Sequence, residues 1–523
     1  MPFIDANTQS SDGDRAAFDV TIVGAGAAGI LLAVLLSRRG QRVLVIESGH
    51  FEPDDERQSL NEIEQTAKQM SNAVWNRKRA IGGTTTAWGG QSLPFGRLDF
   101  ETRDWVERSG WPISFDSLQP YYDIANRFMG VDERNYDSDI LGLLDRRDPG
   151  FDPALLHYHY SKWARQPNFY TLHREGLERD VTVLYNAHLL RIDLATNGRV
   201  QAIEVGDFQG RRQAMAVKTL VLACGGVEAN RILLLNDHQI PGGLGSGSGW
   251  LGKAFMEHPC LDAGYVVSPD MRALQELFGT RVRGGRRYSV RLSAGAGWQR
   301  ANRLLNISAS LMWLYEGDDI GPLSELRSFV RQPRLEGALK MARSSRQLAA
   351  GLWTLARSGL IYKPGAAAKL SLMCEQQPSR DSYIALGEER DRFGARKARL
   401  HWRIGHLTWD TVLGFCRTLD DEIQRLGLGH VRLFDALQSD ATDFETHLSD
   451  VNHHMGGARM SASPTDGVVD DQLQVWGIPN LHVCSAAVFP TSSHSNPTLT
   501  LLALAARLVD RLSKVERPAE LRS

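Results

Sequence analysis

The sequence has few cysteines, and none of them lies near another. It contains no Cys-x-x-Cys pair, which argues against a structural zinc or iron–sulfur site; the five cysteines are Cys224, Cys260, Cys374, Cys416 and Cys484. Isolated cysteines also suit a reducing compartment, where disulfides do not persist. We therefore expect no metal site in this chain.

Long apolar runs and an excess of one charge sign are also lacking. No run approaches the about 18 uninterrupted apolar residues of a membrane-spanning helix, and residues 1–17 are polar and acidic, unlike a signal peptide. The formal net charge of -1 gives no field that would attract nucleic acid or an anionic membrane. These absences predict a cytoplasmic protein with no membrane span and no nucleic-acid partner.

What the chain does contain begins with a strand–helix–strand pattern. Residues 18–24 (FDVTIVG) predict a short buried strand, residues 27–39 (AAGILLAVLLSRR) an apolar helix, and residues 42–46 (RVLVI) a second strand. This second strand is followed by Glu47, where an acid can accept hydrogen bonds from an adenosine ribose. The order of elements is typical of the first unit of a dinucleotide-binding fold.

Three glycines join the first strand to the helix in a Gly-x-Gly-x-x-Gly pattern. Gly24 permits a tight turn, Gly26 allows a pyrophosphate to approach the backbone, and Gly29 lets the helix pack closely on the strand. The helix N-terminus offers N–H groups and partial positive charge to the phosphates. The pattern predicts a dinucleotide cofactor, but it does not separate FAD from NAD.

Further segments carry a family resemblance. They are IGGTTTAWGGQS (81–92), SGWPISFDSLQPYY (109–122), VLACGGVEANRILLL (221–235), HHMGGARM (453–460) and GVVDDQLQVWGIPNLHVCSAAVFPTSSHSNPTLT (467–500). Together with the glycine-rich unit, they resemble the glucose-methanol-choline (GMC) oxidoreductases. Within that family they are most similar to the branch that holds pyranose oxidase and bacterial glycoside 3-oxidising enzymes. The resemblance covers most of residues 18–130, 181–260 and 450–513.

The resemblance implies an α/β fold (α+β overall), in which a Rossmann-like FAD-binding domain is assembled from both chain ends. A substrate domain built on an antiparallel sheet is inserted between them. The expected divisions are 1–17 (a disordered or extended tail), 18–265 (first part of the FAD domain), 266–449 (substrate domain) and 450–523 (C-terminal part of the FAD domain). Alternating patterns over 285–315 and 368–404, with a hairpin over 381–402, predict strands of a sheet that covers the flavin.

The resemblance also implies a catalytic pair, His453 and Asn496. His453 matches the histidine of the family's His-x-Met-Gly block, and Asn496 matches the second position in the segment that ends Asn-Pro-Thr-Leu-Thr. A histidine has an unperturbed pKa of about 6.5 and can take a hydroxyl proton near neutral pH. The neighbouring His454 and His494 are expected to be structural.

FAD is the implied cofactor. In the pyranose oxidase branch a loop histidine is bonded covalently to the flavin; the matching residue here is Ala87, so we expect non-covalent FAD. Ser485 stands where some members carry an aspartate near the flavin phosphates, and a serine can form a hydrogen bond there without adding charge. The expected cofactor-binding residues are Gly24, Gly26, Gly29, Glu47, Gly83, Thr84, Thr85, Trp88, Gly89, Gly90, Leu189, Ala223, Ser485, Ala486 and Thr498, with the hydroxyls of Thr84, Thr85 and Thr86 available as donors.

The predicted activity is oxidation of a secondary alcohol of a sugar or glycoside to a keto-sugar, with oxygen or an external electron acceptor. Alternatives are a non-sugar alcohol substrate, a flavin-containing lyase similar to hydroxynitrile lyases, and a flavin-binding protein without turnover. An NAD-dependent dehydrogenase ranks last, because that function would not explain the presence of the C-terminal sequence blocks at 453–460 and 467–500. A homo-oligomer is compatible with the sequence.

A basic, amphipathic stretch over 325–364 is predicted to be helical. It could contact a membrane, an anionic substrate or a partner subunit. A solvated face or an oligomer contact is the favoured interpretation.

Overall fold

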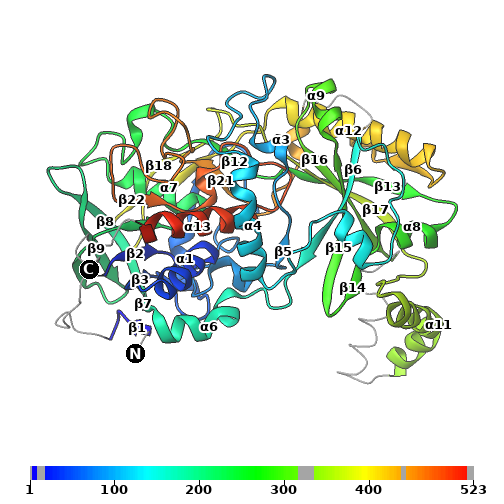
Figure 1. Cartoon of the computed structure of the whole chain (residues 1–523), viewed down its shortest axis with the longest axis horizontal. Helices are drawn as coiled ribbons and strands as arrows, with labels where there is room; N and C mark the ends of the chain where they lie inside the picture. The colour runs from blue at the N-terminus through cyan, green and yellow to red at the C-terminus, as the bar shows by residue number, and fades with distance from the viewer. Residues whose placement is uncertain (1–2, 9–17, 316–334, 438–442, 515–523) are drawn as a thin grey trace, which may run out of the picture.

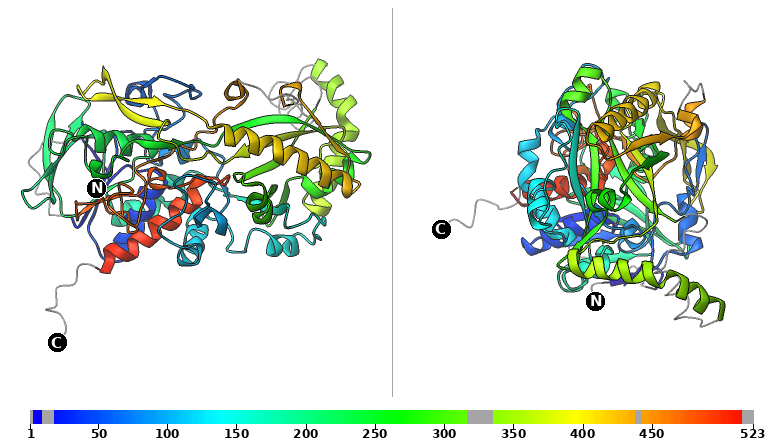
Figure 2. Two further views of the ribbon diagram at one scale, coloured as in Figure 1. Left: turned by 90° about the horizontal axis from the view of Figure 1, so that it is seen from above. Right: turned by 90° about the vertical axis from the view of Figure 1, so that its right-hand side faces the viewer.

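A computed structural model describes residues 3–8, 18–315, 335–437 and 443–514 (Figure 1). These residues form two lobes that lie side by side in Figure 1 and in the left view of Figure 2. Each lobe has its own hydrophobic core: the first surrounds the N-terminal strands and the C-terminal helix, and the second surrounds an antiparallel sheet.

The first lobe is built on a parallel sheet of six strands. In spatial order they are β1 (Phe3–Asp5), β7 (Thr182–Tyr185), β3 (Val43–Ile46), β2 (Val20–Val23), β11 (Leu220–Leu222) and β22 (Leu481–Val483). All five pairings are parallel. Both chain ends therefore contribute strands to one sheet, as the sequence predicted. Because β1 pairs with β7 at the edge of this sheet, residues 3–5 of the expected N-terminal tail belong to the folded lobe.

Helices cover this sheet and hold the C-terminal part against the N-terminal part. They are α1 (Ala27–Arg38), α13 (Pro497–Lys514), α4 (Phe115–Met129) and α6 (Phe169–Asp180), and α13 packs against both α1 and α4. Residues 28–34 and Leu36 of α1 are all buried. A helix that is apolar on every side must be enclosed, which explains the run of aliphatic residues seen in the sequence.

The second lobe is built on an eight-stranded antiparallel sheet. Its strands are β20 (His430–Leu433), β13 (Cys260–Val267), β17 (Ala367–Cys374), β16 (Ile307–Leu314), β15 (Arg286–Ala294), β6 (Leu156–Trp163) and β5 (Gln91–Ser92), with β14 (Arg281–Arg283) paired to β15. Helix α12 (His406–Arg425) packs against β16 and β17. Strands β5 and β6 come from residues assigned above to the FAD domain, because the chain crosses between the lobes more than once.

A mixed five-stranded sheet contains the hairpin over 381–402. Its order is β21 (Met455–Gly457), β12 (Lys253–Met256), β18 (Tyr383–Arg390), β19 (Arg396–His401) and β4 (Ile63–Gln65). The hairpin itself is present, since β18 and β19 pair antiparallel. The expectation that it joins the sheet of residues 285–315 is wrong: β18 pairs with β12 and β19 with β4. Alternation of polar and apolar residues fixes a strand's faces but does not choose its partner.

Beyond these sheets and helices, the described residues contain a small three-stranded sheet and seven further α-helices. Strands β8 (Ala187–Leu194), β9 (Val200–Asp207) and β10 (Arg212–Ala216) form a separate antiparallel sheet. The other helices are α2 (Asp55–Gln58), α3 (Arg97–Phe100), α5 (Ser138–Leu143), α7 (Gly226–Leu235), α8 (Met271–Phe278), α9 (Ala296–Asn302) and α11 (Leu335–Ser358). None of the helices in the described ranges is long and apolar enough to cross a bilayer.

Helix α11 accounts for much of the basic stretch predicted over 325–364; residues 325–334 lie outside the described residues. Figure 1 shows α11 projecting from the lobe of the eight-stranded sheet. Its Trp353 is 66% exposed.

Candidate active site

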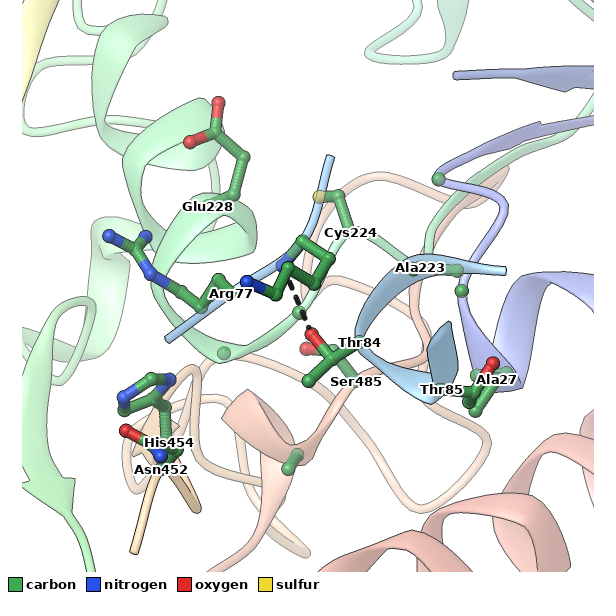
Figure 3. Close-up of a pocket in the computed structure, with 18 of the residues that line it drawn as sticks. Ala27, Arg77, Thr84, Thr85, Ala223, Cys224, Glu228, Asn452, His454 and Ser485 are labelled. Atoms are coloured by element: carbon green, nitrogen blue, oxygen red, sulfur yellow. Dashed lines mark hydrogen bonds between the residues drawn. The ribbon is translucent and has the colours of Figure 1, made fainter. Parts of the chain in front are cut away.

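A cavity of about 720 Å³ opens at the carboxyl ends of the parallel strands. Gly24 follows β2, Glu47 follows β3, Ala223 follows β11 and Ser485 lies just beyond β22, and all four line it. Figure 3 shows side chains from the N-terminal, middle and C-terminal parts of the chain around this space. This edge of an open parallel sheet is where nucleotide cofactors bind, and the volume is within the usual range of about 300–1,000 Å³ for ligand sites.

The glycine turn has the geometry that the sequence predicted. Gly24 has φ +104°, and a Cβ there would lie 2.7 Å from the carbonyl oxygen of Ala223. A Cβ on Gly29 would lie 1.9 Å from the carbonyl oxygen of Gly24, so helix α1 and the turn are in direct backbone contact. A Cβ on Gly26 would meet no protein atom within 4 Å and would project toward the cavity that Gly26 lines. This open backbone fits a pyrophosphate at the N-terminus of α1.

Glu47 lines the cavity and is held by backbone N–H groups. Its carboxylate accepts hydrogen bonds from Ala25 N–H (2.8 Å) and from Gly49 N–H (2.7 Å). Burial raises the pKa of Glu47, while these hydrogen bonds and the nearby Arg79 oppose the rise. Oε1 also accepts from the Ser48 hydroxyl at 3.4 Å, whereas Oε2 accepts from Ala25 N–H and can still accept from a ribose hydroxyl.

The threonine loop, which contains the 3₁₀ turn η2 (Gly83–Thr86), departs in part from the prediction. The hydroxyl of Thr85 donates to Gly82 O at 2.5 Å and accepts from Phe169 N–H, and the hydroxyl of Thr86 donates to Gly83 O at 2.8 Å. Their hydroxyl protons are therefore used within the loop. The hydroxyl of Thr84 accepts from Lys78 N–H at 3.3 Å and keeps its own proton for a ligand.

Thirteen of the fifteen residues predicted to bind the cofactor line this cavity, as do His453, Asn496 and Ala87. The two exceptions are Gly29 and Gly90. Gly29 supports the helix–strand contact, and Gly90 has φ +71° and accepts a hydrogen bond from Ala164 N–H.

Several lining residues were missed by the sequence analysis; they include Gln91, Arg77, Lys78, Trp163, His188 and Glu228. The basic run over 77–79, directly before the threonine loop, was the available signal for Arg77 and Lys78.

The two predicted catalytic residues lie together. Asn496 Nδ2 is 3.4 Å from His453 Nε2, although the residues are 43 positions apart in the sequence. The backbone N–H of His453 donates to the buried carboxyl group of Glu257, whose pKa burial raises to about 8. His453 follows Asn452, which has φ +64°, and precedes β21, so the backbone is fixed on both sides of the imidazole.

His258, which sequence analysis did not identify, sets the hydrogen-bonding state of His453. His258 Nε2 lies 3.0 Å from the carbonyl oxygen of Ser492, and because a carbonyl only accepts, this nitrogen carries the proton. Burial lowers the pKa of His258 to about 4, so the ring is neutral and its Nδ1 is an acceptor. His453 Nδ1 lies 2.8 Å away and must donate. This leaves His453 Nε2 unprotonated beside Asn496.

His453 is held in its neutral, basic form. Burial lowers the pKa of His453 well below its usual value, and the positive charge of Arg291 lowers it further. The ring therefore stays unprotonated over the whole neutral range and can accept a proton at Nε2.

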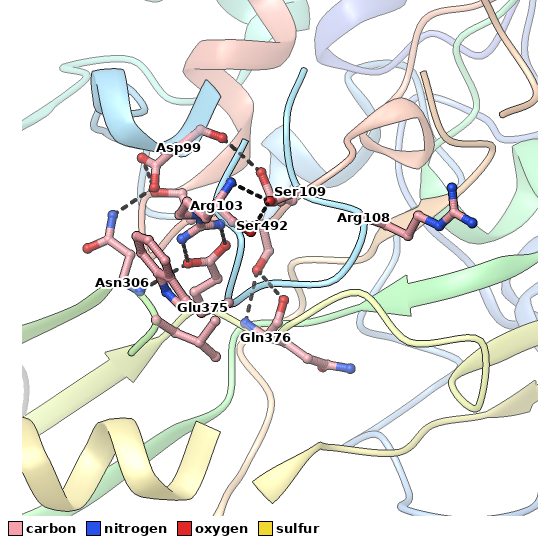
Figure 4. A network of polar contacts seen from close by, with 12 residues as sticks. Asp99, Arg103, Arg108, Ser109, Asn306, Glu375, Gln376 and Ser492 are labelled. Carbon is pink, nitrogen blue, oxygen red and sulfur yellow. Dashed lines mark hydrogen bonds and ion pairs between the residues drawn. The ribbon is translucent and has the colours of Figure 1, made fainter. Parts of the chain in front are cut away.

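A buried polar network fixes the loop over 491–496 that carries Asn496 (Figure 4). Arg103 and Glu375 form a fully buried bidentate ion pair, at 2.6 and 2.8 Å. The Ser492 hydroxyl accepts from Gln376 N–H, and the Ser493 hydroxyl donates to Asp99. Because Glu375 and Gln376 directly follow β17, the network ties the loop to the eight-stranded sheet.

The other two histidines are buried, in keeping with the structural role expected of them. His454 nevertheless lines the same cavity, and its Nε2 has no hydrogen-bond partner among the described residues. His494 lines a second cavity of about 550 Å³.

Comparison with known proteins agrees with this geometry. Residues 19–246 match the family model described as FAD dependent oxidoreductase, and residues 378–505 match the model described as GMC oxidoreductase. The fold and the cavity are thus those of a FAD-dependent oxidoreductase. The chain belongs to the GMC oxidoreductases, which act on alcohol groups. The predicted family and fold class are confirmed.

Individual relatives are distant. The chain is 23% identical to 2-methyl-1,2-propanediol dehydrogenase of Mycolicibacterium austroafricanum, over 95% of each chain. It is 32% identical to C-glycoside 3-oxidase of Microbacterium trichothecenolyticum, over 28% of this chain and 27% of that one. The crystal structure of pyridoxine 4-oxidase from Mesorbium loti shares the fold, with a TM-score of 0.56 and 16% identity over 96% of this chain and 100% of that one. The closer relation to the pyranose oxidase branch stays a prediction.

Proposed function

We propose that this chain oxidises a secondary alcohol of a sugar or glycoside to the ketone, with non-covalently bound FAD. The observation that carries the proposal is the hydrogen-bond chain from Ser492 O through His258 to His453, because it leaves His453 Nε2 as an unprotonated base beside Asn496 Nδ2. Such a pair suits removal of a hydroxyl proton.

The residues act as follows. His453 Nε2 accepts the hydroxyl proton of the substrate, and the Asn496 amide donates a hydrogen bond to the same oxygen. Glu257 accepts from the His453 N–H and holds the base in place. Gly26, Glu47, Thr84 and Ser485 would hold FAD, which supplies, when bound, the acceptor for the hydride of the alcohol carbon. Ala87 has no nucleophile with which to form a covalent link.

A polar surface beside the cavity favours a polyhydroxylated substrate. Gln91 lines the cavity and donates to the Ser161 hydroxyl at 2.7 Å, and Trp163 donates to the Ser289 hydroxyl at 2.9 Å. These side chains share one face of the eight-stranded sheet. A polar wall of this kind matches the hydroxyl groups of a sugar better than an apolar alcohol.

The second candidate is oxidation of a small non-sugar alcohol, which the full-length similarity to a diol dehydrogenase supports. Anaerobic mixing of the FAD-bound protein with glycosides, sugars and short diols distinguishes the two, with flavin bleaching as the signal. Bleaching by sugars or glycosides at the lowest concentrations supports the proposal. Bleaching by diols alone supports the second candidate, and bleaching by no alcohol favours the lyase or non-catalytic alternatives. Oxygen or an external molecule as electron acceptor, and a homo-oligomer, stay predictions.

A further inference from the structure

Arg291 lies at the centre of the polar face that borders the active site. On β15 it is directly opposite His159 of β6, and its guanidinium Nη2 lies 3.4 Å from Gln91 Oε1. The alternate residues Val290 and Leu292 point into the apolar core instead. Side chains on a strand alternate between faces, so Arg291 shares its face with Ser289 and Ser293.

No carboxylate pairs with Arg291 among the described residues. The Nε atom of Arg291 is buried without a hydrogen-bond partner within the described ranges. Burial lowers the pKa of Arg291 to about 10, so the side chain remains a cation at neutral pH. Among the buried arginines, four form an ion pair: Arg79 with Glu228, Arg103 with Glu375, Arg231 with Asp391, and Arg281 with Glu276. A fifth, Arg459, instead donates to the carbonyl oxygens of Arg108 and Asp466. An unpaired charge inside a protein is costly, so an external anion is the natural partner of Arg291.

The neighbours of Arg291 connect it to both cavities. Gln91 lines the larger cavity together with His453 and Asn496. His159 and Ser293 line the second cavity, whose wall also contains His494 and Ser495 of the loop that carries Asn496. Arg291 itself lines neither cavity, and a molecule whose hydroxyl faces His453 approaches the guanidinium at Gln91, whose Oε1 lies 3.4 Å from it.

We propose that Arg291 is the anion-binding residue of the substrate site, and that the alcohol oxidised by this protein carries a carboxylate or phosphate group. The planar guanidinium can donate two parallel hydrogen bonds to either group. The inference rests on the proposed function, because it assigns the charge of the substrate bound there.

Matched pairs of alcohols test the inference in the wild-type, FAD-bound protein. We would measure anaerobic flavin reduction by D-glucose, D-glucuronate and D-glucose 6-phosphate, and by 1,2-propanediol and lactate. The acidic member of a pair should half-saturate at about 10- to 100-fold lower concentration than the neutral member, the range of a charge-assisted hydrogen bond. Comparison of D-glucuronate with D-glucose 6-phosphate shows whether the site prefers a carboxylate or a phosphate. A neutral member that half-saturates at the same or a lower concentration than its acidic partner overturns the inference.

A binding measurement keeps the inference separate from the proposed function. Acetate and inorganic phosphate are titrated into the FAD-bound protein, and the visible difference spectrum of the flavin reports binding. We expect Arg291→Gln to lower the affinity for the more tightly bound of the two anions at least tenfold, and Arg291→Lys to lower it less. The control Arg283→Gln replaces an exposed arginine on β14 and should leave the affinity unchanged. Equal anion binding by wild type and Arg291→Gln, or no anion binding by wild type, overturns the inference. Failure of every alcohol to reduce the flavin would instead reject the proposed function.

Discussion

At the scale of single residues, the account depends on which nitrogen of His453 carries a proton. Two hydrogen bonds fix this, one from His258 Nε2 to Ser492 O and one from His453 Nδ1 to His258 Nδ1. The sequence pointed to His453 and Asn496 because each lies in a recognisable block. It could not point to His258, which is 195 positions from His453 and belongs to no pattern that predicts the contact.

The pH dependence of flavin reduction follows from the state of His453. Burial lowers the pKa of His453, so protonation that disables the base requires a more acidic solution than for a free histidine. The limiting rate of anaerobic reduction should therefore stay constant from about pH 8 down to about pH 6.5 and fall only at lower pH. A stopped-flow series in matched buffers measures this. A rate that has already halved at about pH 6.5, the ordinary histidine pKa, contradicts the expected shift.

Replacing His258 tests its positioning role. His258→Ala removes the acceptor that fixes the His453 tautomer. We expect a slower limiting rate with FAD still bound, and a smaller loss in His258→Gln, whose amide oxygen can still accept a hydrogen bond. Equal losses in the two variants would indicate a structural role alone.

At the scale of elements, the turn between β2 and α1 was predictable in detail because each glycine has a distinct steric reason. The hairpin of β18 and β19 was predictable as a hairpin, but its neighbours β12 and β4 were not, since strand partners depend on the whole chain. The Thr85 hydroxyl was expected to be available as a donor and instead donates within its own loop, because in sequence the two kinds of hydroxyl look the same.

Two alanine substitutions separate packing from cofactor binding in this turn. Gly29→Ala places a Cβ 1.9 Å from the Gly24 carbonyl oxygen, so it should destabilise the apoprotein by about 1–3 kcal/mol through overpacking. Gly26→Ala meets no protein atom, so it should leave the melting temperature of the apoprotein unchanged and weaken FAD binding more than tenfold. Thermal melting of both apoproteins, followed by FAD titration, measures the difference. Unchanged FAD affinity in Gly26→Ala would show that no phosphate approaches this backbone.

The network under the loop over 491–496 gives a second prediction at this scale. Glu375→Ala leaves Arg103 buried without its partner and should lower the free energy of unfolding by about 3–5 kcal/mol. Asp116→Ala is the control, because it breaks an exposed ion pair with Arg97 and should leave the free energy of unfolding nearly unchanged. Urea denaturation of wild type and of the two variants measures the free energy of unfolding of each. Equal losses in the two variants would mean that the buried pair does not hold the loop.

At the scale of the whole molecule, the active site joins two lobes with separate cores. His453 and Asn496 come from the C-terminal part of the chain, while Gln91 and Trp163 come from the eight-stranded sheet. The family and fold class were predictable because motifs at both chain ends share one parallel sheet. The course of β5 and β6 between the lobes was not, because the sequence carries no mark of which sheet a short strand joins.

Release of the cofactor tests the prediction drawn from Ala87. Acid precipitation of the purified yellow protein should leave FAD in the supernatant, and added FAD should raise the melting temperature by mass action. The visible absorbance of the supernatant and of the redissolved precipitate measures how much flavin is in each. Flavin that stays with the precipitated polypeptide would mean a covalent link to another residue of the cavity.

The central claim is that His453 is the base, and single-residue variants test it most directly. Anaerobic stopped-flow reduction is compared for wild type, His453→Ala, Asn496→Ala, His454→Ala and His494→Ala, after FAD content has been verified. We expect His453→Ala to retain FAD and to slow reduction by about 10²–10⁴-fold, the usual contribution of a positioned general base. Asn496→Ala should have a smaller effect, and the other two variants the smallest. Full activity in His453→Ala, or a larger loss in His454→Ala or His494→Ala, would contradict the account.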